Sequence, residues 1–205
     1  MSDNGSSNMD DFFKIKTNNV LPEKGKLLIA DPFASDFYFT RSVVLLSEYR
    51  KEEGAMGFIL NKPMDSKNYP SEIFETFGEK NLPHVYYGGP VGTTQMFYIH
   101  QLPPDVLDGS MEILPNLYWG GVFSDLVELI KSGVVSLDKV KFFIGYSGWA
   151  PGQLENEISR NFWVIANTNS KEIFENTTDF WKRKLMGLGP RYKLWTIYPV
   201  DPQNN

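Results

Sequence analysis

The segment from Val140 to Arg160 constrains the fold more tightly than any other part of the chain. Val140–Gly145 is a nearly continuous apolar run, which predicts an interior strand covered on both faces. Three glycines and a proline then fall within eight residues of the sequence Gly145-Tyr-Ser-Gly-Trp-Ala-Pro-Gly-Gln-Leu-Glu-Asn-Glu157 and restrict its backbone path. Because Gly152 can serve as an N-cap with Glu155 at position N3, the sequence predicts a helix over Gln153–Arg160.

Short strands and interspersed helices predict an α+β fold with a mixed sheet rather than a regular βαβ array. Segments rich in β-branched or aromatic residues, mostly bordered by turn residues, are interpreted as strands. The predicted strands are Lys26–Ala30, Ser42–Ser47, Gly57–Leu60, Val85–Tyr87, Gln95–His100, Val140–Gly145, Phe162–Asn167 and Tyr192–Tyr198.

Capping patterns place the helices. A capping box over Asp125–Glu128 predicts that a helix opens there and that Gly133 closes it. A second box over Asn169–Glu172 opens a longer helix, which ends near Gly187 or Gly189. The other predicted helices are Asp10–Lys16 and Ser71–Phe77.

Composition narrows the possible functions. A hydrophobic share of 41% is typical of a globular chain, and 205 residues favour one domain, predicted over 10–205 behind a disordered tail over 1–9. The chain has no cysteine and two histidines, so disulfides, Cys–zinc sites, iron–sulfur clusters and a three-His metal site are excluded, and neither metal nor cofactor is predicted. The 25 acidic against 20 basic residues argue against specific nucleic-acid binding.

The sequence also predicts no association with a membrane. No stretch is long and apolar enough to span a bilayer. The N-terminus has neither the basic nor the apolar region of a secretory signal. A cytoplasmic location is therefore predicted.

The helix after Gly152 carries the main polar candidates. Glu155 and Glu157 lie about 200° apart around a helix, so they cannot both address one bond, which disfavours a glycosidase. Gln153 and Glu157 share a face, where they either clamp a polar ligand or tie the loop to the helix. The start of the motif resembles a nucleophile elbow, but Trp149 stands where glycine is required and both histidines lie upstream, which disfavours a serine hydrolase.

Four other features each allow a functional and a structural interpretation. Gly88–Gly89 can form an amide nest for an anion or a tight strand–turn–strand connection. The amide of Asn61, at a strand end, can orient a ligand or close a turn. His100 is more typical of a packed, hydrogen-bonded residue than of a catalyst. Five basic residues within Lys182–Lys193 either complement helix dipoles on a solvated face or bind phosphate.

Taken together, these motifs resemble the YqgE/AlgH family of bacterial proteins, whose function is not known. The resemblance spans about residues 25 to 189. The matching stretches are Gly25–Pro32, Phe39–Leu46, Gly54–Pro63, Gly88–Val91 with His100, Gly145–Glu157 and Trp163. The chain departs from the common family pattern over Ser110–Ser124, so a cleft wall built from that segment is expected to differ.

The resemblance implies an α+β fold in which a mixed β-sheet, partly closed on itself, is surrounded by helices. It implies a bacterial cytoplasmic protein but no established activity. Some members are labelled as transcriptional regulators, yet nothing in this chain resembles a helix-turn-helix. Together with Ser147 in the same motif, the family pattern gives the candidate ligand-binding residues Arg41, Ser42, Asn61, Gly88, Gly89, Pro90, Ser147, Gly148, Trp149, Gly152, Gln153 and Glu157.

Three hypotheses follow. The first is a small-ligand-binding or regulatory domain without catalysis, in which Asn61, the Gly88–Pro90 turn and the Trp149–Glu157 element converge on one cleft. The second is a metal-independent hydrolase or transferase with Glu157 as acid or base and Arg41 as anion clamp. The third is a structural or protein-interaction module. The partner is an unknown small molecule or protein, and the sequence predicts no particular oligomeric state.

Overall fold

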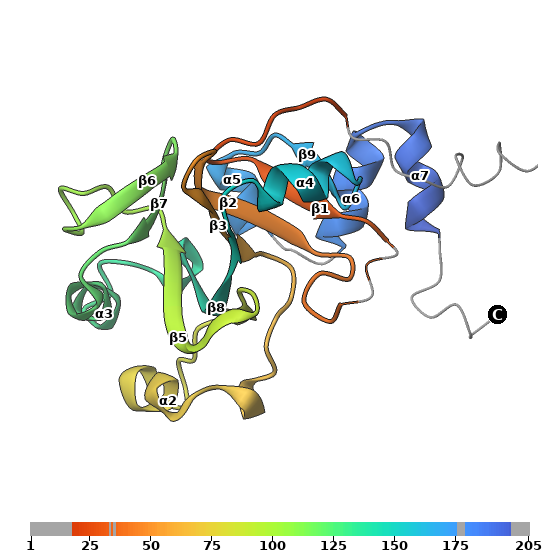
Figure 1. Cartoon of the computed structure of the whole chain (residues 1–205). Helices are drawn as coiled ribbons and strands as arrows, with labels where there is room; N and C mark the ends of the chain where they lie inside the picture. The colour runs from red at the N-terminus through yellow and green to blue at the C-terminus, as the bar shows by residue number, and fades with distance from the viewer. Residues whose placement is uncertain (1–17, 33, 35, 176–178, 198–205) are drawn as a thin grey trace, which may run out of the picture.

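The computed structural model describes residues 18–32, 34, 36–175 and 179–197, and within them nine strands form one curved sheet (Figure 1). The strands are β1 (Leu27–Ala30), β2 (Val43–Arg50), β3 (Gly54–Ile59), β4 (Val85–Tyr87), β5 (Val91–His100), β6 (Ser110–Leu114), β7 (Leu117–Gly120), β8 (Val140–Trp149) and β9 (Trp163–Ala166). The predicted tail over 1–9 and the predicted helix Asp10–Lys16 lie outside the described residues.

The sheet is mixed, as predicted. Its order is β6-β7-β5-β8-β3-β2-β1-β9, and β4 pairs with β8 off this path. β4 runs parallel to β8, whereas the other strand pairs are antiparallel. Within the described chain, β6 and β9 end the order without pairing with each other, so the sheet is not closed into a barrel. The sheet nevertheless curls until β6 contacts β2.

Short helices surround this sheet. They are α2 (Ser71–Phe77), α3 (Phe123–Lys131), α4 (Gln153–Ser159), α5 (Ser170–Phe174), α6 (Phe180–Gly187) and α7 (Pro190–Thr196), with 3₁₀ turns at Ser66–Asn68 and Leu137–Lys139. None of these described helices has the length and apolarity needed to cross a membrane. The α+β arrangement with surrounding helices confirms the predicted fold class.

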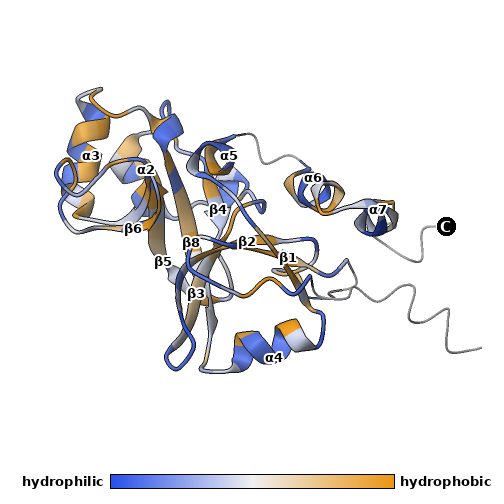
Figure 2. Cartoon of the chain, turned by 90° about the horizontal axis from the view of Figure 1, so that it is seen from above, coloured by the Kyte–Doolittle hydropathy of each residue, from blue (hydrophilic) through white to orange (hydrophobic). Residues whose placement is uncertain are grey.

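Helices cover both faces of the β1–β2 region because successive side chains of a strand point to opposite sides. Leu27 and Ile29 pack with α5, α6 and α7, whereas Leu28 and Ala30 pack with α4. Figure 2 shows α4 on one side of β1 and β2 and the other three helices on the opposite side. All four residues of β1 are therefore buried. A third cluster joins α2 and α3 to β5 and β8.

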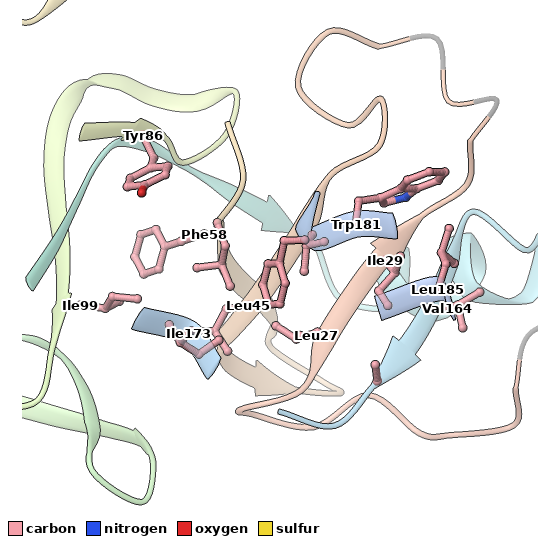
Figure 3. Packing of buried hydrophobic residues seen from close by; sticks show 14 of the residues in the cluster. Leu27, Ile29, Leu45, Phe58, Tyr86, Ile99, Val164, Ile173, Trp181 and Leu185 are labelled. Carbon is pink, nitrogen blue, oxygen red and sulfur yellow. The ribbon is translucent and has the colours of Figure 1, made fainter. Parts of the chain in front are cut away.

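The largest core cluster lies under α5 and α6 (Figure 3). Phe58 of β3 stacks on Phe143 of β8, with ring centroids 5.0 Å apart. Trp181 of α6 packs into the same cluster, and its indole Nε1 donates to the carbonyl oxygen of Ala30 at 2.8 Å. This bond satisfies the polar atom of a buried aromatic side chain and fixes α6 against β1.

The chain crosses the face of β8 between β4 and β5. Phe142–Ile144 of β8 pairs with β4 on one edge and with β5 on the other. The connection Gly88–Pro90 must therefore pass over β8, and it does so at Gly145 and Tyr146. A Cβ atom added at Gly88 would lie 2.0 Å from the carbonyl oxygen of Gly145, and one at Gly89 would lie 2.3 Å from the carbonyl carbon of Tyr146. Only glycine permits this close approach of two backbones.

The predicted C-terminal strand Tyr192–Tyr198 is wrong, because Pro190–Thr196 forms helix α7. Pro190 occupies the first turn after Gly189, where its missing N–H costs nothing. Tyr192 and Trp195 then meet one turn apart, with centroids 5.4 Å apart, and both are buried in the largest core cluster. Burial of this helical pair outweighs the strand propensity of the aromatic residues. Tyr198 lies outside the described residues.

The single long helix predicted after Asn169 is also wrong. Asn169 does cap the N-terminus, since its Oδ1 accepts a hydrogen bond from the amide of Glu172 at 3.0 Å. However, α5 ends at Phe174, and α6 begins only after Asp179, whose φ of 57° is left-handed. Two short helices therefore replace one.

The start of α3 also differs from the prediction. The helix begins at Phe123 after Val122, so the predicted capping box over Asp125–Glu128 is not its N-terminus. Gly133, with a φ of 76°, follows the helix end as predicted.

Sequence analysis missed the β6–β7 hairpin. The two strands are joined by Pro115 and Asn116, and Asn116 has a φ of 61°. Proline followed by a residue with positive φ is a turn signal that could have revealed the hairpin. It was obscured because neither strand alternates regularly between buried and exposed residues: β6 has two adjacent exposed residues, and β7 is partly buried over Tyr118–Gly120.

Replacing Gly88 by alanine should destabilise the fold strongly, because the new methyl group would collide with the backbone of β8. We expect a loss of at least about 3 kcal/mol in the free energy of unfolding, or no folded protein. Gly187→Ala is the matched control, since its added Cβ meets nothing within 4 Å. Chemical denaturation of both variants should separate them. Equal stabilities of the two variants would contradict the close passage of Gly88 across β8.

Candidate functional site

Glu157 binds three side chains in the corner between β8, α4 and β9. Its Oε2 accepts hydrogen bonds from the indole Nε1 atoms of Trp149, at 2.8 Å, and Trp163, at 2.7 Å. Its Oε1 accepts one from Gln153 Nε2 at 2.9 Å. Both indoles are buried, and Phe39 packs against them. The carboxylate therefore holds two core tryptophans from different strands.

The direction of these bonds is fixed by the amide of Gln153. Gln153 cannot turn its amide around, because its Oε1 accepts a hydrogen bond from the backbone N–H of Ala150 at 3.0 Å. All three partners of Glu157 are therefore donors, and its two carboxyl oxygens act as their acceptors. This geometry matches the interpretation in which Gln153 and Glu157 tie the loop to the helix.

Glu155 faces another element. Its Oε1 accepts a hydrogen bond from the hydroxyl of Tyr49 at 2.6 Å. Burial, followed by this bond, raises the pKa of Tyr49 to about 12. Gly152 is the N-cap of α4 as predicted, with a φ of 75°, but Glu155 does not complete a capping box with it among the described residues. Glu155 instead fixes α4 to β2.

Asn61 closes the corner where β2 begins. Its Oδ1 accepts from the amide of Val43 at 2.8 Å, and its Nδ2 donates to the carbonyl oxygen of Arg41 at 2.9 Å. These bonds hold Arg41 at a left-handed φ of 52°. The guanidinium of Arg41 lies over the indole of Trp181, 5.1 Å from the centroid, and burial lowers the pKa of Arg41. Ser42 is fully buried, and its Oγ has no hydrogen-bond partner among the described residues.

The backbone groups of Gly88 are used inside the sheet. The amide of Gly88 donates to Ile144 at 2.9 Å. The carbonyl oxygen of Gly88 accepts from the amide of Ile59 at 3.0 Å and from the Oγ of Ser147 at 3.1 Å. Ser147 is fully buried. The Gly88 amide is therefore engaged in the sheet rather than presented to an anion.

His100 is fully buried at the end of β5. Its Nδ1 accepts from the amide of Leu102 at 3.1 Å, so its Nε2 carries the proton and donates to the carbonyl oxygen of Gly120 at 2.9 Å. Desolvation lowers the pKa of His100, although the bond to the carbonyl oxygen of Gly120 opposes that shift. The hydroxyl of Tyr98 donates to the carbonyl oxygen of Gly121 at 2.5 Å. Tyr98 and His100 together therefore anchor the end of β7.

A groove of about 990 Å³ lies where the β2–β3 hairpin, the β6–β7 hairpin and β8 meet. It exists because the curl of the sheet brings β6 against β2. Its lining residues are Lys24, Ser47, Glu48, Tyr49, Arg50, Glu53, Gly54, Ala55, Met56, Val91, Met111, Glu112, Trp119, Tyr146, Gly148 and Trp149.

Charged residues and apolar residues are both exposed in the groove. Val91 is 39% exposed and Met111 is 45% exposed, and both line it. Arg50 forms an ion pair with Glu53 at 2.9 Å. The ammonium of Lys24 donates to the backbone carbonyl oxygen of Glu112 at 2.8 Å.

Of the predicted site residues, only Gly148 and Trp149 line this groove. The groove does not unite Asn61, the Gly88–Pro90 turn and the Trp149–Glu157 element, because the first two do not line it, although Val91, directly after the turn, does. Among the basic residues near the C-terminus, Lys184 pairs with Glu172. No group of three or more acidic or histidine side chains is placed to hold a metal within the described ranges.

Most groove residues escaped sequence analysis because they come from strands far apart in the chain. One signal was present, since Met111, Glu112 and Trp119 belong to the segment Ser110–Ser124, which was expected to alter a cleft wall. Their contact with β2 and β3 depends on the curl of the sheet, which no local pattern encodes.

An open, mixed sheet with a crossed central strand and short covering helices defines the class of α+β protein to which the chain belongs. A family model described as AlgH-like matches residues 27–193. A UPF0301 protein of Parabacteroides distasonis is 43% identical over 194 residues, covering 94% of this chain and 96% of that protein. One of Cytophaga hutchinsonii is 42% identical over 184 residues, covering 89% and 98%. The chain belongs to the AlgH-like family, whose members are uncharacterised.

Solved structures share the fold. The solution structure of the AlgH protein from Pseudomonas aeruginosa is 29% identical, with a TM-score of 0.63, and the match covers 86% of this chain and 94% of that one. A crystal structure of a protein from Corynebacterium diphtheriae is 22% identical, with a TM-score of 0.69 over 90% and 95% of the two chains.

Replacing Glu157 by glutamine should weaken the corner between β8, α4 and β9. A carboxamide would direct an N–H₂ group either at the indoles or at Gln153, which are themselves donors, so at least one of these bonds would be lost and the others would lose their charged acceptor. We expect a loss of about 1–3 kcal/mol in the free energy of unfolding. Glu155→Gln is the control, because an amide oxygen can still accept from Tyr49. If denaturant titration shows equal losses of unfolding free energy in the two variants, the hydrogen-bond directions assigned at Glu157 are contradicted.

Burial of His100 should make stability depend on pH. Because the folded-state pKa is lowered, the unfolded chain takes up a proton first as the pH falls through about 6.5, so stability is full above that value and decreases below it. We expect the free energy of unfolding to fall as the pH decreases from about 6.5 to 5.5, by at most about 1.4 kcal/mol per unit. His100→Gln should flatten this profile. His84 is exposed, and His84→Gln is the control that should leave the pH profile unchanged. A flattened profile in that variant would contradict the assignment of the pH dependence to His100.

Proposed function

We propose that the chain is a small-molecule-binding domain whose ligand occupies the groove between the two hairpins and β8. The exposed apolar floor of that groove carries the proposal. This proposal keeps the hypothesis of ligand binding without catalysis, but its ligand lies away from Glu157 and Arg41. Both of these side chains pack against tryptophans and do not line the groove.

The floor suits an apolar or aromatic ligand body. It consists of Met56, Val91, Met111, Trp119 and Tyr146, none of which is fully buried. A volume near 990 Å³ lies at the upper end of the range of about 300–1,000 Å³ for small-molecule sites. Methionine side chains adapt their shape to a ligand, and the aromatic rings supply flat contact area.

The charges favour a ligand that carries an amino group. Arg50 is neutralised by Glu53, and Lys24 is held by a backbone carbonyl. Glu48 and Glu112 also line the groove, and within the described part of the chain neither carboxylate forms an ion pair. A cationic group bound between the rim and the apolar floor would satisfy this excess of negative charge.

A binding screen tests this proposal. Small aromatic and branched aliphatic amines, nucleotides, flavins, phosphate-bearing metabolites and small anions would be compared by NMR and by thermal shift. We expect an amine with an apolar body to bind and to stabilise the fold, by about 2.7 kcal/mol at a hundredfold excess over Kd. Met111→Trp should abolish binding by filling the groove, and Glu112→Gln should weaken it about tenfold.

Met186→Trp is the matched control. Met186 on α6 is 50% exposed, close to the exposure of Met111, but does not line the groove. Binding by the parent that survives Met111→Trp, or is equally lost in Met186→Trp, would refute the groove as the site. A parent that binds none of these compounds at up to about 1 mM would refute the proposed function.

A further inference from the structure

A second cluster of chemistry-bearing side chains lies at the opposite end of β3 from the groove. β3 begins at Gly54, which lines the groove, and ends at Ile59. Lys62 follows three residues later and lies over the ring of Phe37, with its Nζ 5.8 Å from the centroid. Phe37 is 65% exposed, although it is a large apolar side chain.

Neighbouring aromatic rings fix the orientation of Phe37. Its centroid lies 5.4 Å from that of Tyr38 and 5.9 Å from that of Tyr87, and both pairs meet at 80°. Tyr38 and Tyr87 are 6.5 Å apart at 81°. These edge-to-face contacts hold the Phe37 ring in one orientation while most of its surface stays exposed.

Lys62 is a half-buried cation without a countercharge in contact. Its ammonium forms no hydrogen bond or ion pair within the described part of the chain. Partial burial lowers the pKa of Lys62, while the more distant charge of Asp36 opposes that shift. A polar group that is partly desolvated without a bonded partner costs stability, and such violations are typical of binding sites.

Two hydrogen bonds position the backbone at Lys62 and at Phe37. Tyr87 donates its amide to the carbonyl oxygen of Lys62 at 2.9 Å, which joins β4 to the end of β3. Asp36 Oδ1 accepts from the amide of Tyr38 at 2.8 Å and closes the turn that carries Phe37. Because both partners are positioned before any ligand arrives, little ordering entropy is lost on binding.

We propose that Phe37 and Lys62 form a second ligand site, which takes a planar aromatic ring carrying an anionic group, either phosphate or carboxylate. The ring stacks on the exposed surface of Phe37, and the ammonium of Lys62 binds the anion. This class of ligand differs from the amine expected in the groove, and the two sites stand independently.

Four probes separate the two contacts by titration calorimetry and aromatic NMR. AMP and 2-naphthoate both combine a ring with an anionic group but come from different chemical sources. Adenosine lacks the anion, and ribose 5-phosphate lacks the aromatic ring. We expect AMP, 2-naphthoate or both to bind with a Kd near or below about 1 mM, and each partial probe to bind at least about tenfold more weakly.

Variants place the binding at this cluster. Phe37→Leu keeps an apolar side chain but removes the ring, and Lys62→Gln keeps the stem but removes the charge. Each should raise the Kd about tenfold. The matched controls are Phe162→Leu and Arg160→Gln, because Arg160 lies over the 43% exposed ring of Phe162, 5.1 Å from its centroid. These controls and Met111→Trp should leave the Kd unchanged.

Three outcomes would overturn the proposal. The first is that neither AMP nor 2-naphthoate binds the parent at up to about 1 mM. The second is equal binding of adenosine or ribose 5-phosphate, which would remove one of the two contacts. The third is binding that persists in Phe37→Leu and Lys62→Gln, or that is lost in Met111→Trp, which would assign the ligand to the groove instead.

Discussion

The passage of Gly88 and Gly89 across β8 is the contact on which the rest of the sheet depends. It lets one strand pair with β4 and β5 on opposite edges and then, beyond Gly145, with β3. Any side chain at Gly88 would hold the two backbones apart. Without this crossing, β5 could not reach its edge of β8, and the β6–β7 hairpin that extends from β5 would lose its place opposite β2.

Polar side chains of the glycine-rich motif act mainly on the scaffold. Glu157 joins two buried indoles, Gln153 fixes the loop before α4, and Asn61 closes the corner at the start of β2. Glu157 and Asn61 satisfy indole and backbone donors that would otherwise be buried without a partner, whereas the bond of Gln153 to the amide of Ala150 lies at the surface. A motif that looks like a ligand clamp in the sequence thus has its hydrogen-bonding capacity largely used within the protein.

The two proposed sites lie at opposite ends of β3 and differ in chemistry. The groove has an apolar floor beside unpaired carboxylates, whereas the Phe37–Lys62 cluster offers an aromatic surface beside an ammonium. β3 lies between β2 and β8 and packs Phe58 into the core, so the two sites are joined by a buried strand. Each site is built from side chains at strand ends and turns, where the chain can expose functional groups without opening the core.

The sequence by itself determined the local elements and the scaffold motif. The apolar run Val140–Gly145, the helix Ser71–Phe77 and the glycines of the crossing follow from side-chain size, spacing and backbone freedom. Tertiary structure decided what these signals leave open. The aromatic segment Tyr192–Tyr198 satisfies both strand and helix propensity, and packing of Trp195 under α6 selected the helix. Groove residues such as Met56, Met111 and Trp119 meet only because the sheet curls, and curl depends on contacts between distant strands rather than on any local pattern.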